Sequence, residues 1–534
     1  MITLSPMAQS DLFEKLKNPA IYGPNVHSIE TIQTHISLVL LTGTYAYKIK
    51  KPVNFGFLDF STLEKRKHFC EEEIRLNKRL CPDIYLEVLP ITEKNNNISL
   101  NGSGKIIEYA LKMKEFSQDN IMTNKLQSGQ IHEETIDKIC SKLVDFYAKG
   151  PQTEEINTYG KTEIIQQNID ENFEQTQEVI GTTIDKKVFD TIQNASNNLL
   201  STKKDCFDKR IKKGYIKDCH GDLHSGNIVI SDKIYIFDCI EFNKRFRYGD
   251  IASDIGFLAM DLDYLNHPYL SSYLIDKYIE LSKDQDLFTV LNFYKSYRAY
   301  VRGKVIGFKL TDPHINKSEQ ENTRNIAKKY FELSHYYAAL FSLDLQKKRP
   351  LLFLVSGLSG TGKSTLSLKL SIDYHAQQIN SDIVRKEIAG IDKFEKHLDD
   401  INTGLYDPKT TERTYDKIME KATHHLQKNQ NVIIDATLQK EKYRNIAKQI
   451  ADDTNAILIT LQCICPDAIV KQWLEERMTK KTVSDGRWEI YLHQKKTFEP
   501  FHSKKNHLEI DMSKQTYTKR MEYFWNILKT VQEA

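Results

Sequence analysis

The sequence has no apolar run long enough to cross a membrane and no cysteine pair at a zinc-binding spacing. Its longest apolar runs, 38–41 and 351–355, have the length of strands, whereas a membrane helix needs about 20 apolar residues. The eight cysteines are scattered and include no C-x-x-C pair, so neither a zinc site nor a disulfide framework is expected. Residues 1–11 lack the features of a secretory signal. We therefore expect a cytoplasmic protein without a membrane partner.

An excess of either charge is also missing. The chain has 75 Lys and Arg against 72 Asp and Glu, for a formal net charge of +3. This balance argues against a protein that coats nucleic acid, although it leaves a local basic groove open. The 534 residues are 40% hydrophobic, which is enough for packed cores, and the length predicts two or three domains. There is no repeat of solenoid period and no long low-complexity tract.

Two architectures follow one another along the chain. The first part mixes strands and helices. The second alternates them after a glycine-rich loop, which predicts an α/β domain with a parallel sheet. We expect a first domain at 1–343, a charged, proline-terminated linker at 344–350 and a second domain at 351–534. The expected strands are 35–41, 45–50, 98–100, 106–113, 228–230, 234–237, 351–355, 376–380, 431–434 and 456–461, with 98–113 forming a hairpin and helices at 63–80, 131–200 and 251–341.

Residues 220–227, which read HGDLHSGN, contain a first phosphate-handling pattern. Phosphoryl transfer needs a carboxylate beside the acceptor hydroxyl and oxygen ligands for Mg²⁺. Asp222 and Asn227 have the spacing of the catalytic Asp and the magnesium-binding Asn of protein kinases, and Asp238 ends a strand shortly afterwards. We expect Asp222 to be catalytic and Asn227 and Asp238 to bind metal. The alternatives are a turn without catalysis and a zinc site made of His220, Asp222 and His224.

The same type of site needs a lysine on a strand and a glutamate on the next helix. The run YAYK ending at Lys48 matches the V-A-I-K pattern, so Lys48 is expected at the α- and β-phosphates. Lys50 lies on the same strand face, and the choice between the two lysines stays open. Glu73 is the expected partner, because Ile74 and Leu76 mark the buried side of its helix. No G-x-G-x-x-G precedes these strands, which leaves the other nucleotide contacts unassigned.

A second phosphate-handling pattern, a Walker A loop, begins where the apolar run 351–355 ends. Its backbone N–H groups are expected to hold phosphates at a helix N-terminus. Lys363 would reach the β- and γ-phosphates, and the Ser364 hydroxyl would bind Mg²⁺. The predicted nucleotide-binding residues are Gly357, Leu358, Ser359, Gly360, Thr361, Gly362, Lys363, Ser364 and Thr365.

Past this loop, the segment NSDIVRK at 380–386 resembles the polynucleotide kinase, zeta-toxin and gluconate kinase-like group. That resemblance implies that Asp382 activates the acceptor hydroxyl and that Arg385 holds the substrate. Asp435, at the end of an apolar strand, is expected to support magnesium or to orient Arg385. Arg477 resembles the lid arginine of that group, although the position four residues earlier is Trp473 instead of the usual Arg. Two further arginines are considered, Arg444 facing the substrate and Arg487 as an alternative lid charge.

The first pattern resembles the aminoglycoside phosphotransferase and choline kinase-like group. In that group the segment corresponding to 249–254 begins a helix, which implies that Asp250 supports the catalytic loop. Over nearly its whole length the chain resembles bacterial bifunctional proteins that join an aminoglycoside phosphotransferase-like domain to a P-loop ATP-binding domain of AAA type. The resemblance implies an α+β protein-kinase-like domain followed by an α/β P-loop kinase domain.

These patterns together predict a tandem, bifunctional ATP-dependent phosphotransferase that uses Mg²⁺ and transfers the γ-phosphate to hydroxyl groups of small molecules or nucleotides. One alternative is a C-terminal kinase of polynucleotide 5′-hydroxyls, against which the lack of a basic–aromatic stripe counts. The other is that one domain binds ATP only to regulate. The acceptors and the oligomeric state do not follow from the sequence.

Overall fold

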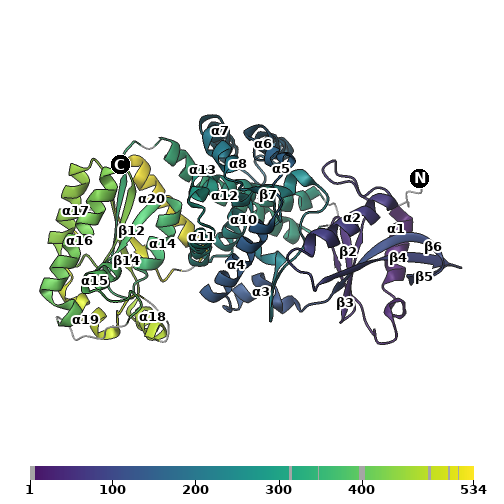
Figure 1. Cartoon of the computed structure of the whole chain (residues 1–534), viewed down its shortest axis with the longest axis horizontal. Helices are drawn as coiled ribbons and strands as arrows, with labels where there is room; N and C mark the ends of the chain where they lie inside the picture. The colour runs from purple at the N-terminus through teal and green to yellow at the C-terminus, as the bar shows by residue number, and fades with distance from the viewer. Residues whose placement is uncertain are drawn as a thin grey trace. The chain divides into compact units, whose positions relative to one another are not determined.

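A computed structural model describes residues 6–311, 315–346, 348–395, 403–478, 483–502, 505–514 and 516–534. The chain divides into two compact units, whose elements are labelled in Figure 1. The first unit contains Met1–Asn168, Lys203–Asp261 and Lys277–Asp284. The second contains Ile169–Thr202, Leu262–Asp276 and Gln285–Ala534.

A six-stranded antiparallel sheet opens the first unit. One of its faces packs against α1 (Pro6–Leu16), and the other packs against α2 (Leu63–Asn77). Helix α2 begins where the Thr62 hydroxyl accepts a hydrogen bond from the amide of Lys65. The sheet order is β1-β2-β3-β6-β4-β5, with β1 (Glu30–Gln33), β2 (Ser37–Leu41), β3 (Tyr45–Lys50), β4 (Tyr85–Lys94), β5 (Asn97–Leu100) and β6 (Lys105–Lys114).

The hairpin predicted over 98–113 is wrong. Strand β5 pairs with β4, where Leu100 lies opposite Ile91, and β4 separates β5 from β6. The tight turn is at Asn95 and Asn96, whose φ angles are +52° and +67°. Two consecutive residues of positive φ make the two-residue turn that matches the twist of a hairpin, and asparagine tolerates this conformation well. The hairpin is therefore formed by β4 and β5 around Asn95–Asn96, and not by β5 and β6 as predicted.

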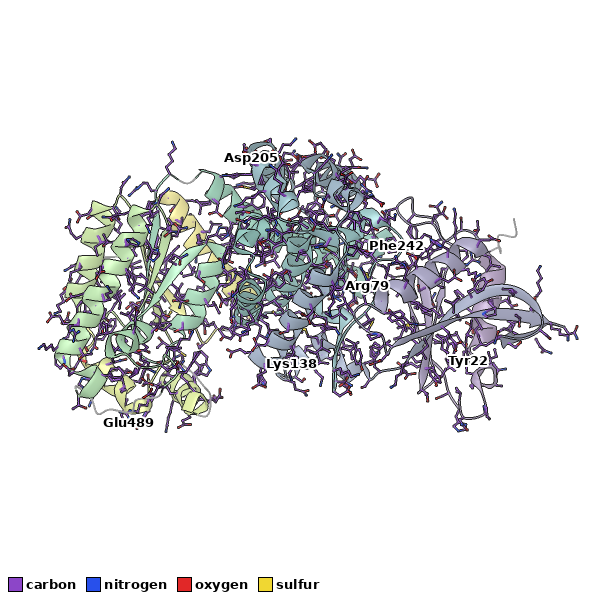
Figure 2. The ribbon with its side chains drawn as sticks, viewed as in Figure 1. Tyr22, Arg79, Lys138, Asp205, Phe242 and Glu489 are labelled. Carbon is purple, nitrogen blue, oxygen red and sulfur yellow. The ribbon has the colours of Figure 1, made fainter. Side chains whose placement is uncertain are left out.

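The remainder of the first unit is mainly helical and includes two pairs of short antiparallel strands. Strands β8 and β9 form the predicted antiparallel hairpin, and β7 pairs with β10. Arg79, labelled in Figure 2, follows α2 and donates hydrogen bonds to the carbonyls of Asp218 (3.1 Å) and Cys219 (3.2 Å) at the end of β7. The elements are α3 (Met122–Gln127), α4 (Glu133–Lys149), α5 (Glu154–Thr158), α8 (Lys204–Lys212), β7 (Ile216–Asp218), β8 (Ile228–Ile230), β9 (Ile234–Ile236), α9 (Lys244–Arg247) and β10 (Tyr248–Asp250). Helices α6 (Thr162–Thr176), α10 (Ile251–Tyr264) and α11 (Pro268–Ser282) each contribute residues to both units.

The second unit contains the parallel sheet that the sequence predicts. Its order is β12-β13-β11-β14-β15, and every neighbouring pair is parallel. All six residues of β11 are buried, as expected for a central strand covered on both faces. The strands are β11 (Leu351–Ser356), β12 (Ala376–Asn380), β13 (Asn431–Asp435), β14 (Ile457–Ile464) and β15 (His507–Asp511). The helices after β11 are α14 (Lys363–Asp373), α15 (Ser381–Ala389), α16 (Pro408–Gln427), α17 (Glu441–Asp453), α18 (Asp467–Met478), α19 (Trp488–Thr497) and α20 (Tyr517–Glu533).

Helices α7 (Lys186–Thr202), α12 (Phe288–Gly307) and α13 (Lys317–Gln346) belong to the same unit as this sheet. The Tyr336 hydroxyl of α13 donates a 2.7 Å hydrogen bond to the Asp373 carboxylate at the end of α14. The Asn292 amide of α12 donates to the Asp373 carbonyl at 3.2 Å. The predicted linker 344–350 begins within the last turn of α13, and its Lys347 lies outside the described residues. The domain limits 1–343 and 351–534 stay predictions.

Among the described helices, none combines the length and the apolar character that crossing a membrane requires.

Candidate active sites

Three glycines shape the turn from β11 into α14, and each has a positive φ. A Cβ on Gly357 would lie 2.4 Å from the carbonyl oxygen of Cys463. A Cβ on Gly360 would lie 2.8 Å from the Leu474 Cγ of α18. Gly362 is the N-cap of α14 and is left-handed at φ +90°. Only glycine combines this conformation with such close approaches, so the loop has the backbone of a phosphate-binding turn at a helix N-terminus.

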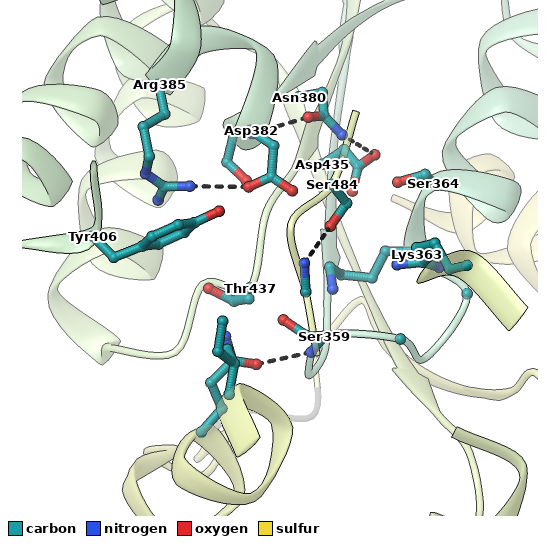
Figure 3. Close-up of a pocket in the computed structure, with 17 residues that line it drawn as sticks. Ser359, Lys363, Ser364, Asn380, Asp382, Arg385, Tyr406, Asp435, Thr437 and Ser484 are labelled. Carbon is teal, nitrogen blue, oxygen red and sulfur yellow. Dashed lines mark hydrogen bonds and ion pairs between the residues drawn. The ribbon is translucent and has the colours of Figure 1, made fainter. Parts of the chain in front are cut away.

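A pocket of about 680 Å³, open mouth included, lies beside this loop (Figure 3). It brings together most of the residues predicted for the second site, although they come from four separate stretches of the chain. Gly357, Leu358, Thr361 and Thr365 are not among its lining residues. The lining consists of Ser359, Gly360, Gly362, Lys363, Ser364, Asn380, Ser381, Asp382, Arg385, Tyr406, Asp435, Thr437, Arg477, Ser484, Gly486, Ile490 and Gln494.

Lys363 and Asp435 are two opposite charges beside the phosphate-binding turn. Burial lowers the pKa of Lys363, an effect that the Asp435 carboxylate opposes, and its ammonium donates to the Leu358 carbonyl at 2.8 Å. Burial likewise raises the pKa of Asp435, which is 2% exposed. One oxygen of this carboxylate accepts from the amides of Gln378 (3.0 Å) and Asn380 (2.8 Å). The Ser364 hydroxyl lies on the same carboxylate and lowers its pKa.

Asp382 and Arg385 form an ion pair of 2.9 Å on α15, at the opposite side of the pocket. Their helix starts at Asn380, whose side-chain oxygen accepts from the amides of Asp382 and Ile383. The Arg385 guanidinium also stacks on the Tyr406 ring, 4.6 Å from its centre. Asp382 therefore faces the pocket with a neighbouring cation and can accept a proton from a hydroxyl placed there.

Three arginines besides Arg385 are candidates for the substrate or the lid, and the structure separates them. Arg477 lines the pocket, and burial lowers its pKa. Arg487 is the N-cap of α19 and does not line the pocket. The substrate-facing position suggested for Arg444 is wrong. Its guanidinium donates to backbone carbonyls, including those of Leu438 (2.9 Å) and Pro500 (2.9 Å), and so holds two loops together.

Some residues of the pocket carry little or no signal in the sequence. Asn380 was quoted only as part of a motif, yet it joins the cap of α15 to Asp435. Gln494 lies more than 130 positions from the loop, and its side-chain oxygen accepts from the amide of Ser359 at 2.8 Å. Tyr406 carried no sequence signal either. The suggestion that Asp435 orients Arg385 is not supported, because Arg385 pairs with Asp382 instead.

In the first unit, Lys48 of β3 lies between two carboxylates. Its ammonium donates to Glu73 at 2.8 Å and to Asp238 at 2.6 Å. Glu73 is wholly buried on α2, and Asp238 follows β9 with a φ of +61°. Burial raises the pKa of Glu73, but Lys48 and Lys50 outweigh it and bring the pKa to about 2. Three predicted residues from distant parts of the sequence thus meet in one ion-pair chain.

Lys50 makes a different pair of contacts. It donates to the second oxygen of Glu73 at 2.6 Å and also pairs with Glu241. The Lys50 side chain is 1% exposed. The Lys48 side chain is 16% exposed and pairs with Asp238, which is itself partly exposed. This difference favours Lys48 as the lysine that a nucleotide can reach. The sequence does not single out Glu241 as a site residue, and its only signal there is its position three residues after Asp238.

Asp222 and Asn227 are neighbours, as their spacing predicted. The Asn227 amide donates to the backbone carbonyl of Asp222 (3.0 Å) and to its carboxylate (3.1 Å). His224 Nε2 lies 3.4 Å from the same carboxylate, while its Nδ1 accepts from the amide of Gly226. Because Nδ1 is an acceptor, the neutral ring carries its hydrogen on Nε2, toward Asp222.

The zinc alternative for this loop gains no support. His220 is buried and uses Nε2 on the Phe237 carbonyl (2.9 Å) and Nδ1 on the amide of Asp222 (3.3 Å). Its ring nitrogens are therefore engaged with backbone. Within the described residues, no three His, Cys, Asp or Glu side chains are arranged to hold a metal ion.

The residue that supports this loop is Asp254 and not the predicted Asp250. The Asp254 carboxylate accepts from the amides of His220 (2.7 Å) and Gly221 (3.0 Å), and from the Tyr147 hydroxyl (3.0 Å). Asp250 instead pairs with the buried Arg210 through two hydrogen bonds. Both carboxylates are buried, but only Asp254 reaches the loop.

We expect Asp254→Ala to lower the stability of the first unit substantially. The change leaves two buried backbone N–H groups without an acceptor, and each such loss costs about 1–3 kcal/mol. Chemical denaturation of the full chain, followed by circular dichroism, measures the change. Glu155→Ala, an exposed carboxylate on α5, is the control and is expected to leave the curve nearly unchanged. Equal curves for the two variants would contradict the role given to Asp254.

Comparison with known proteins adds one family. Residues 352–501 match the model of a family described as an AAA domain. This match spans the glycine-rich loop, Asp382 with Arg385, and Arg477, so this part of the chain is similar to that family. Uncharacterized proteins of Mycobacterium tuberculosis and Mycobacterium bovis are 28% identical to this chain over 438 residues, which cover 82% of this chain and 83% of each relative.

Several solved structures of kinases are similar only at low scores. A gluconokinase from Sinorhizobium meliloti is 16% identical and covers 35% of this chain and 96% of its own, at a TM-score of 0.25. The APS kinase of Mycobacterium tuberculosis, solved with AMPPNP and APS, is 14% identical. The match covers 34% of this chain and 99% of the APS kinase, at a TM-score of 0.25. A choline/ethanolamine kinase family protein from Mesorhizobium loti is 12% identical. The match covers 62% of this chain and 98% of that protein, at a TM-score of 0.37.

Proposed function

We propose that the second unit is an ATP-dependent phosphotransferase. The observation that carries this proposal is that Asp382 faces the same pocket as Lys363 and Ser364. A domain that only binds ATP has no need of a carboxylate and an arginine opposite the phosphate-binding turn. A domain that phosphorylates a second substrate needs both, one to accept the hydroxyl proton and one to hold the acceptor.

The proposed reaction transfers the γ-phosphoryl group of ATP to a hydroxyl. The proton of that hydroxyl passes to the Asp382 carboxylate, its oxygen bonds to the γ-phosphorus, and the bond to the β,γ-bridging oxygen breaks to release ADP. Lys363 binds phosphate oxygens, and Arg477 faces the charge that develops during transfer. Arg385 is the acceptor clamp of the proposal.

Magnesium fits the residues on the loop side of the pocket. Ser364 and Asp435 supply hard oxygen donors of the kind that Mg²⁺ prefers. The buried Asp435 carboxylate accepts hydrogen bonds from the uncharged amides of Gln378 and Asn380, and a bound cation would add to the charge compensation that Lys363 gives it. When bound, Mg²⁺ supplies charge neutralisation to the phosphates.

We extend the proposal to the first unit as a second phosphotransferase. The ion-pair chain from Glu73 through Lys48 to Asp238 supports it, because it resembles a phosphate-binding lysine held in place by a glutamate. Asp222 is the proposed base there. Asn227 and Asp238 supply oxygen donors suited to Mg²⁺. The kinship of this unit with aminoglycoside phosphotransferases stays a prediction, and both acceptors are proposed only as hydroxyl compounds, small molecules or nucleotides.

The test blocks each site separately in the full chain. Wild type, Lys48→Met and Lys363→Met are incubated with γ-labelled ATP, Mg²⁺ and a panel of metabolites that includes a 5′-hydroxyl oligonucleotide. The tandem proposal expects each substitution to remove labelling of a different acceptor. Lys138→Met and Lys421→Met, at more exposed lysines of the first and second units, are the matched controls.

Three other outcomes distinguish the alternatives. Labelling of the oligonucleotide that Lys363→Met removes would assign the second unit to polynucleotide ends. Binding of ATP by one unit without transfer to any acceptor would make that unit a regulatory module. Full labelling in both variants would contradict the proposed roles of Lys48 and Lys363.

A further inference from the structure

Lys386 follows Arg385 on α15 but points away from the pocket into the protein. Its side chain is 2% exposed. The ammonium donates to the backbone carbonyls of Glu395 (2.6 Å) and Val483 (2.8 Å) and to the Asp485 carboxylate (3.2 Å). One buried lysine therefore joins α15 to the chain that follows it and to a segment almost 100 positions later. A buried charge is expected only where such partners compensate its desolvation.

Its partner Asp485 extends these contacts toward the predicted base. The Asp485 side chain has no exposure, and its carboxylate also accepts from the Tyr406 hydroxyl at 3.3 Å. The Tyr406 ring in turn lies against the Arg385 guanidinium, which pairs with Asp382. The contacts thus run from Lys386 through the buried Asp485 to Tyr406, Arg385 and Asp382, of which the last three line the pocket.

The segment held by Lys386 also rests on the phosphate-binding turn. Ser484 and Gly486 line the pocket, on either side of the buried Asp485. A Cβ on Gly486 would lie 3.2 Å from the Ser359 Cβ, so the two backbones are in close contact. A shift of residues 483–486 would therefore change the wall of the pocket beside Ser359 and the position of Tyr406 at once.

We propose that Lys386 is a positioning residue for phosphoryl transfer in the second unit. It holds residues 483–486 and, through Asp485 and Tyr406, keeps Arg385 and Asp382 in the geometry that transfer needs. It does so without contacting the nucleotide. The inference rests on the proposed function for its kinetic consequence, but the structural role of Lys386 is testable without any activity.

The experiment compares wild type with Lys386→Met and with the double variant Lys386→Met/Asp485→Asn, in the full chain. The double variant removes both charges together, so it stays informative where the single variant leaves Asp485 buried and unpaired and fails to fold. Lys421→Met is the matched control. Lys421 pairs with Glu387, which lies on α15 like Lys386, and this ion pair is more exposed than that of Lys386. The measurements are Mg·ADP affinity by calorimetry, kcat and KM for the acceptor, and hydrogen exchange of the amides of residues 483–487.

The proposal expects a much smaller change in Mg·ADP affinity than in kcat/KM, faster exchange at 483–487 and a fall in kcat/KM of about 100-fold, the loss typical of a reacting group misplaced by about 1 Å. Unchanged exchange and unchanged kcat/KM in a folded double variant would overturn it. An equal loss of Mg·ADP affinity would also overturn it, because a general collapse of the pocket then explains the result. Should wild type transfer phosphate to no acceptor, the proposed function fails while the exchange data still decide the role of Lys386.

Discussion

Asp263→Ala is expected to lower the free energy of unfolding of the full chain by about 3–5 kcal/mol, the usual cost of breaking a buried ion pair. Asp263 lies at the end of α10 and pairs with Lys295 at 2.7 Å. The Lys369 ammonium of α14 is 3.9 Å away, and the Tyr337 hydroxyl donates to the same oxygen at 2.5 Å. All of these groups are buried. Without the carboxylate, Lys295 is left as a buried cation without its counter-charge.

Urea denaturation at neutral pH measures this effect. Asp416→Ala, an exposed position in the middle of α16, is the control and is expected to change stability by less than about 0.5 kcal/mol. The double variant Asp263→Asn/Lys295→Met removes both charges and is expected to recover most of the loss, because replacing a whole buried pair is often nearly neutral. An Asp263→Ala variant as stable as its control would show that the carboxylate does not compensate the lysines.

The same carboxylate predicts a pH dependence. Burial raises the pKa of Asp263, but Lys295 and Lys369 outweigh this and bring it below the ordinary value of 3.8. A group whose pKa is lower in the folded state stabilises fully above its unfolded pKa and loses this contribution as pH falls through the folded value. The stability difference between wild type and Asp263→Ala is therefore expected to shrink below pH 3.8, and denaturation series at several acidic pH values measure it.

Asp382→Asn is expected to reduce phosphoryl transfer by the second unit by about 10²–10⁴-fold, the contribution typical of a general base. The amide keeps the size of the side chain and its hydrogen-bonding reach to Arg385 but cannot accept the hydroxyl proton. Affinity for Mg·ADP is expected to stay the same, because Lys363 and the glycine-rich loop are unchanged.

Single-turnover transfer and calorimetric ADP binding, measured on the same preparations, separate these effects. Glu387→Gln makes the same kind of change at an exposed position of the same helix and is the matched control. If Asp382→Asn retained full transfer, Asp382 would not be the base, and the distinction between a kinase and an ATP-binding module would have to rest on other residues.

Local patterns allowed the sequence to predict the parts of the fold and of the sites that depend on neighbouring residues. The parallel sheet followed from a buried apolar strand that leads into a glycine-rich loop, because this order suits few structures. The pairing of Lys48 with Glu73 followed from a strand lysine and the buried side of the next helix. Each inference used residues within about one supersecondary unit.

For the carboxylate that supports the loop at 220–227, the deciding partner lies far away in sequence. Asp250 is the last residue of β10 and Asp254 lies in the first turn of α10, so their positions in the sequence alone do not decide which of them supports the loop. Arg210 takes Asp250, and this leaves Asp254 for the loop. The predicted hairpin had a local competitor in Asn95–Asn96, whose turn signal was present but weaker than the glycines that follow it.

The close approach of Gly360 to α18 joins two parts of the second site that look independent in the sequence. A side chain at position 360 would meet Leu474 and also Val470, whose Cγ1 would lie 3.0 Å from its Cβ. Arg477 lies on the same helix, one turn after Leu474. The loop and the helix that carries the arginine are therefore in direct contact at Gly360. Smaller residues at 470 or 474 would make room for a Cβ there, but the φ of +81° would still strain any other residue, so we expect glycine to be kept at position 360 among relatives.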